Sequence, residues 1–91
     1  MSESILKKQI LEELRRIAKR ELEFEGAIDA AMTLKEDLAL DSMGMIVVAV
    51  GLENKFRVRL DEEDAGDLST VGDLLSLVEQ RITEQTLAGA A

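Results

Sequence analysis

The chain of 91 residues has no cysteine, histidine, proline, tryptophan or tyrosine, and it has only two phenylalanines. Without cysteine and histidine it lacks the thiol nucleophile, the commonest general base and the usual zinc ligands. Catalytic triads, cysteine catalysis and zinc sites are therefore excluded, and we expect neither enzymatic activity nor a metal site. Few aromatic residues, beside abundant Leu, Ala, Glu, Ile and Val, favour helices over a sheet.

Long apolar runs are also missing. The longest, residues 45–50, is far short of the roughly 20 residues that cross a membrane as a helix. The N-terminus has no signal-peptide pattern, because Lys7 and Lys8 directly follow Ile5 and Leu6. Since no disulfide can form either, these features predict a soluble protein of the cytoplasm.

Acidic residues outnumber basic ones, and the formal net charge is −8. Residues 1–20 carry six Lys or Arg and three Asp or Glu, whereas residues 21–91 carry five and sixteen. The acidic part should repel nucleic acid and suit partners with basic surfaces. We interpret the basic residues of the first segment as the solvated face of a helix.

Two segments have helical periodicity. In residues 2–22 apolar side chains recur at nearly 3.6-residue spacing, which predicts an amphipathic helix capped by Ser2 or Ser4. Residues 71–82 follow the same spacing after a possible cap in the Ser-Thr pair at 69–70. These segments are expected to form the first and last helices of one domain.

The middle of the chain is less regular. Residues 21–41 have spaced apolar side chains without a period, which indicates a long connection packed across the core. Residues 43–56 contain one Ile and three Val that are typical of a strand, but the length of the run favours a helix with Asp41 or Ser42 as N-cap. A helix of one or two turns is expected within residues 61–68.

The turn before the second helix carries a nine-residue motif, Leu-x-x-Asp-Leu-x-x-Asp-Ser, formed by Leu34, Asp37, Leu38, Asp41 and Ser42. In this motif and in its helix pattern, the chain resembles the acyl carrier protein family over about residues 34–78. The resemblance implies an all-α four-helix bundle of acyl-carrier type, with a long first loop and a short third helix. We expect a single domain over 1–91, ordered over about 3–84, with a flexible tail at 85–91.

The resemblance also implies a chemistry. In such carriers a phosphopantetheinyl transferase moves 4′-phosphopantetheine from coenzyme A to the serine hydroxyl, and the terminal thiol then holds an acyl group as a thioester. Ser42 would be the attachment residue, while Asp41 would orient the turn and assist recognition by the transferase. A phosphodiester at the start of a helix is stabilised by free N–H groups and by the positive end of the helix dipole.

Further partners implied by the resemblance are a loading ligase, synthases or acyltransferases of fatty-acid, lipid or polyketide biosynthesis, acting on a monomeric carrier. In the family a hydrophobic acyl chain can fold into a groove between the second and third helices. The matching positions of this sequence are Leu34, Ile46, Leu52, Leu60, Ala65 and Leu68. Any of these residues would serve equally well in an ordinary core.

The second helix departs from the family pattern. Typical fatty-acid carriers have acidic residues soon after the serine, where this sequence has Gly44 and Val47, and Glu53 is the one acid between Met43 and Lys55. We therefore expect a specialised carrier that meets its partners through an apolar surface. The residues expected on that surface are Met43, Gly44, Met45, Val47, Val50 and Glu53.

Two alternatives remain open. The sequence Asp-Ser-Met-Gly also resembles the attachment turn of carriers that hold D-alanine, which makes an aminoacyl, D-alanyl or peptidyl carrier an alternative. From another class, a helical adaptor without catalytic activity would bind a protein through the apolar face of the second helix. Such an adaptor would not need the Ser42 hydroxyl.

Overall fold

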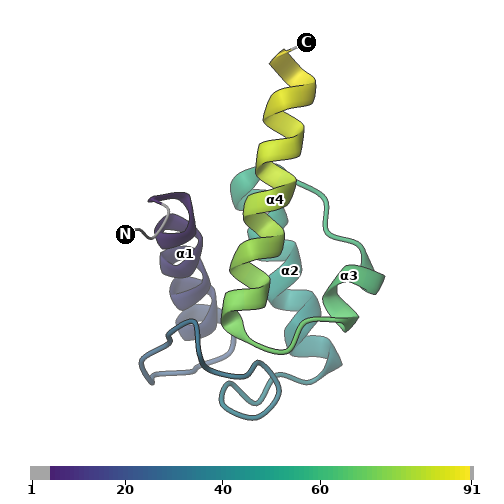
Figure 1. Ribbon diagram of the computed structural model, residues 1–91. Coiled ribbons are helices and arrows are strands. Elements are labelled where there is room, and N and C mark those ends of the chain that lie inside the picture. Colours follow the sequence, from purple (N-terminus) through teal and green to yellow (C-terminus); the bar gives the residue numbers. More distant parts are fainter. Residues whose placement is uncertain (1–4, 91) are drawn as a thin grey trace.

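The structure, a computed structural model, describes residues 5–90, apart from the side chains of residues 62, 65 and 86–90. Its helices are α1 (Ile5–Glu21), α2 (Ser42–Phe56), α3 (Glu62–Gly66) and α4 (Val71–Ala90), as Figure 1 shows. No β-strand occurs within residues 5–90, so the predicted all-α class is confirmed. The expected bundle rests on three long helices, with the five-residue α3 at its side.

The core lies where α1 packs against both α2 and α4. Ile10, Leu14 and Ile17 of α1 are at most 2% exposed, which is the stripe that the 3.6-residue period predicts. From α2 and α4 the core receives Val48, Leu52, Val71, Leu74, Leu75 and Val78. The Val-rich segment is therefore helical, because a helix places Val48 and Leu52 on one buried face.

The long loop of residues 22–41 is fixed by its contacts, as predicted for a connection packed across the core. Ile28 is 1% exposed, and its carbonyl oxygen accepts a hydrogen bond from Nη2 of Arg15 on α1 at 2.9 Å. The Leu34 N–H donates to the Ser69 carbonyl at 2.9 Å, and Thr33 forms an isolated β-bridge with Thr70. The loop is thus joined to the segment that starts α4.

Helix ends largely follow the predicted capping residues. Asp41 is the N-cap of α2, and Thr70 caps α4 through its hydroxyl, which accepts a hydrogen bond from the Asp73 N–H at 3.1 Å. Ser2 and Ser4, the predicted caps of α1, lie outside the described residues. In the structure α4 continues to Ala90, through a proline-free stretch that consists mostly of residues that favour helix. The flexibility of the tail from residue 85 stays a prediction.

Candidate functional site

Ser42 is the first residue of α2 and is exposed to solvent. The preceding residue, Asp41, has an extended backbone, and its carboxylate oxygen Oδ1 accepts the Gly44 N–H at 2.8 Å. This cap fixes the direction in which the chain enters the helix. The Ser42 hydroxyl therefore has a defined position at the positive end of the α2 dipole, as the sequence predicts.

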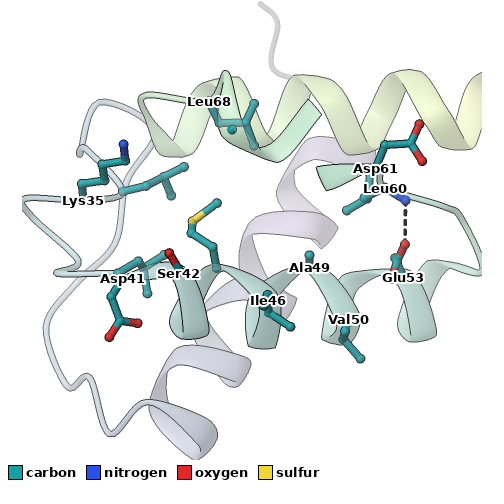
Figure 2. Close-up of a pocket in the computed structure, with 14 residues that line it drawn as sticks. Lys35, Asp41, Ser42, Ile46, Ala49, Val50, Glu53, Leu60, Asp61 and Leu68 are labelled. Atoms are coloured by element: carbon teal, nitrogen blue, oxygen red, sulfur yellow. Dashed lines mark hydrogen bonds between the residues drawn. The ribbon is translucent and has the colours of Figure 1, made fainter. Parts of the chain in front are cut away.

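A groove of about 590 Å³ runs beside Ser42, between α2 and the segment that contains α3 (Figure 2). Along α2 its wall follows one face of the helix, from Ser42 through Ile46 and Ala49 to Glu53. Leu60 and Leu68, which flank α3, form the opposite wall. The complete lining is Leu34, Lys35, Leu40, Asp41, Ser42, Met45, Ile46, Ala49, Val50, Glu53, Leu60, Asp61, Gly66 and Leu68.

Four of the six predicted groove residues line this groove, namely Leu34, Ile46, Leu60 and Leu68. The prediction for Leu52 is wrong, because its side chain is fully buried in the core and does not line the groove. The side chain of Ala65 lies outside the described part of the chain. Helical spacing alone predicts which residues share a face, but the identity of the neighbouring element decides between core and groove.

Lys35 is a groove residue that no pattern in the sequence predicts. Its exposed side chain lines the groove at the end that also contains Asp41 and Ser42 (Figure 2). It occupies a variable position of the Leu-x-x-Asp-Leu motif, where no periodicity marks it. A cation at this end can attract a phosphate group carried by Ser42.

The predicted partner surface of α2 is only partly exposed. Met43 is 69% and Val50 46% exposed, whereas Met45 and Val47 are half-buried. Ile46 is 51% exposed and, together with Met43 and Val50, forms an exposed apolar strip along α2. This strip borders the groove, since Ile46 and Val50 also line it.

Gly44 is buried, so its predicted place on the exposed surface is wrong. A Cβ atom at this position would come 3.1 Å from Cδ2 of Leu40 and 3.4 Å from Oδ1 of Asp41. The glycine therefore lets the capping turn pack closely against the first turn of α2. A structural role explains this residue without any partner.

Glu53 is half-buried and does not extend freely into solvent. Its carboxylate oxygen Oε2 accepts the Leu60 N–H at 2.7 Å, and Figure 2 shows this bond across one end of the groove. The bond joins α2 to the loop that leads into α3. Nothing in the sequence pattern predicts it, because the two residues lie seven positions apart on different elements.

The residues around Ser42 fit a phosphopantetheine group. The hydroxyl is exposed, the helix dipole and Lys35 provide positive potential for a phosphodiester, and an apolar groove lies alongside. The Asp41 carboxylate, which opposes a phosphate electrostatically, is engaged by the Gly44 N–H. Within the described residues, no helix combines the length and the apolar character that a membrane span requires.

The site thus combines an exposed serine at the start of a helix with an apolar groove in an all-helical domain. The sequence profile of the phosphopantetheine attachment site matches residues 12–78, which is more than half of the chain. The chain therefore belongs to the phosphopantetheine-binding family of acyl carrier proteins. Phosphopantetheine is the cofactor of that family.

Individual relatives agree with this assignment. The chain is 32% identical to acyl carrier protein 1, chloroplastic, of Hordeum vulgare over 87 residues, which cover 94% of this chain and 58% of that protein. It is 36% identical over 55 residues to an acyl carrier protein of Exiguobacterium, covering 60% of this chain and 70% of that protein. The crystal structure of an acyl carrier protein from Thermotoga maritima has the same fold, with a TM-score of 0.80, 24% identity and coverage of 91% and 98%.

Proposed function

We propose that this protein carries acyl groups as thioesters on a 4′-phosphopantetheine arm attached to Ser42. The observation that carries the proposal is the placement of one exposed serine hydroxyl at the capped start of α2, directly beside an apolar groove. Family membership supports the cofactor, and the geometry of this turn supports the residue. The carrier would have no catalytic activity of its own.

The arm would supply a terminal thiol, which forms a thioester with the cargo. Attachment forms a bond between Ser42 Oγ and phosphorus, while the bond to the nucleotide part of coenzyme A breaks and the hydroxyl proton leaves. Asp41 keeps the turn in place through its cap, and Lys35 and the first turn of α2 favour the phosphate charge electrostatically. The groove can exclude water from an acyl chain.

The partners of such a cycle would be a phosphopantetheinyl transferase, a ligase that loads the cargo, and synthases or acyltransferases that use it. The apolar strip of Met43, Ile46 and Val50 supports a contact on α2 that depends on burial of apolar area more than on ion pairs. This favours partners whose matching surface is also apolar near the serine.

Attachment is tested by incubating the chain with coenzyme A, magnesium and a broad-specificity phosphopantetheinyl transferase, followed by intact-mass measurement. The expected result is a mass gain of one phosphopantetheine in the wild type and none in Ser42→Ala. Ser69→Ala, which changes another exposed serine before a helix, should load like the wild type. Absence of any mass gain with several transferases would contradict the proposal.

A helical adaptor would give a different pattern. In that case Ser42→Ala would keep cellular function, whereas Met43→Glu, which places a charge on the most exposed residue of the strip, would abolish it. For a carrier, Ser42→Ala should abolish function completely. The comparison is made by complementation of a strain that lacks the chain, with protein levels measured in parallel.

A further inference from the structure

The groove beside Ser42 has two chemically different ends and an apolar middle. One end contains Ser42 and Lys35, and the other contains Glu53 and Asp61 (Figure 2). Between them the lining is apolar, with Met45, Ile46, Ala49, Val50, Leu60 and Leu68. Because a helix rises about 1.5 Å per residue, Glu53 lies about 16 Å along the α2 axis from Ser42.

The carboxylate of Glu53 is held across the far end of the groove. Its Oε2 accepts the Leu60 N–H at 2.7 Å, and Leu60 itself forms part of the opposite wall. A backbone N–H that leaves water requires an acceptor, so rotation of Glu53 away from the groove would cost this hydrogen bond. The carboxylate therefore remains between the two walls, where it joins them.

An apolar chain that enters the groove from the Ser42 end gains contacts with Met45, Ala49 and Leu60 as it lengthens. At Glu53 the gain stops, because a methylene group placed against the carboxylate removes water from a charged group and offers no hydrogen bond in return. Methylene groups beyond this point are better left in solvent.

We infer that Glu53 is a specificity-determining residue, which closes the far end of the groove and sets an upper limit on the length of the apolar acyl chain that the groove holds. The inference rests on the proposed function, because the occupant is the cargo carried on Ser42. It assigns the chain to short and medium acyl groups, whose apolar part fits in the groove between the thiol end of the arm and Glu53. Longer chains would leave their ends exposed.

The test compares the wild type with Glu53→Gln. The amide oxygen of glutamine can still accept the Leu60 N–H, so this variant removes the charge and keeps the connection between the walls. Glu63→Gln is the matched control, because Glu63 is exposed on α3 and does not line the groove. A phosphopantetheinyl transferase loads each protein with butanoyl, hexanoyl, octanoyl, dodecanoyl or hexadecanoyl phosphopantetheine from the corresponding acyl coenzyme A, and loading is verified by intact mass.

The readout is the melting temperature of each acyl form minus that of the same variant with the free thiol, which removes the effect of the substitution on folding. In the wild type and in Glu63→Gln this difference should rise with chain length and then level off before hexadecanoyl. In Glu53→Gln the rise should continue to longer chains and end at least about 4 °C higher, a shift typical of a modest gain in stability for a domain of this size.

If the difference in melting temperature between the acyl and free-thiol forms of the wild type rises steadily up to hexadecanoyl, the inference is overturned. It is also overturned if this difference levels off in Glu53→Gln at the same chain length and the same value as in the wild type, provided that both proteins are loaded. Failure to load Ser42 at all would instead refute the proposed function, and the inference would fall with it. The mass measurement thus separates the two failures.

Discussion

Gly51 lies on the face of α2 that meets α1. A Cβ atom at this position would come 2.6 Å from Cδ1 and 3.1 Å from Cγ1 of Ile17, whose side chain is 2% exposed and would have to shift. The two helices therefore approach each other more closely than a larger residue would permit with Ile17 in its present position. The glycine reduces the helix propensity of α2, but it allows the core of α1 and α2 to form.

We predict that Gly51→Ala destabilises the fold by about 1–2 kcal/mol, because the overpacking cost exceeds the gain in helix propensity. Chemical denaturation of the two proteins measures this difference. Ile17→Val removes the Cδ1 atom that a Cβ at position 51 would meet. The double variant Gly51→Ala/Ile17→Val should therefore lose less stability than the two single variants lose together. Additive effects would mean that the contact does not limit the approach of the helices.

At the scale of elements, α4 begins with a reciprocal cap. The Thr70 hydroxyl accepts the Asp73 N–H at 3.1 Å, while the Asp73 carboxylate accepts the N–H groups of Thr70 at 3.2 Å and Ser69 at 3.1 Å. The hydrogen bond from the Thr70 N–H, followed by that from Ser69, lowers the pKa of the Asp73 carboxyl. The cap also fixes the segment that pairs with the loop before Ser42.

This cap predicts a pH dependence of stability. Because the pKa of Asp73 is lower in the folded chain than in the unfolded chain, its contribution is present above the ordinary aspartate range and is lost as the pH falls through the folded pKa. Asp73→Asn should therefore lower the melting temperature at neutral pH. The difference from the wild type should shrink steadily under acid conditions, and a difference independent of pH would contradict this account.

How well each element could be predicted depends on how far apart in the sequence its contacting residues lie. The three long helices follow from local spacing and capping residues, and Asp41 and Ser42 follow from a contiguous motif. Leu52 was misplaced because periodicity does not say which element a face meets. The Glu53–Leu60 bond joins two elements, and therefore no local pattern in the sequence reports it.

The short helix α3 is held to the rest of the domain by a few polar contacts and by the apolar residues that flank it. Arg81 of α4 forms an ion pair with Asp64 of α3, which raises the pKa of the guanidinium group, and Glu53 of α2 holds Leu60 just before α3. Leu60 and Leu68 pack against the core on either side of it. This wall of the groove is thus fixed by a few polar links and two apolar anchors.

At the scale of the whole molecule, the chain has 19 acidic and 11 basic residues. Net repulsion among these charges opposes the compact state. We predict that the melting temperature rises with sodium chloride, since the screening length falls from about 10 Å at 0.1 M to about 3 Å at 1 M. The double variant Glu36→Lys/Glu63→Lys, which changes two exposed acids, should respond less. A melting temperature that falls with salt would contradict the prediction.

The bridge between Thr33 and Thr70 bears on the synthesis of the protein. Residues 32–34 of the loop before Ser42 exchange hydrogen bonds with the start of α4, since Leu34 donates to Ser69 and Val71 donates to Met32. A nascent chain that ends before residue 70 cannot form these contacts, although Ser42 has already been made. These contacts of the loop therefore form only after the start of α4 has been synthesised, whereas the local cap from Asp41 to Gly44 needs no later residue.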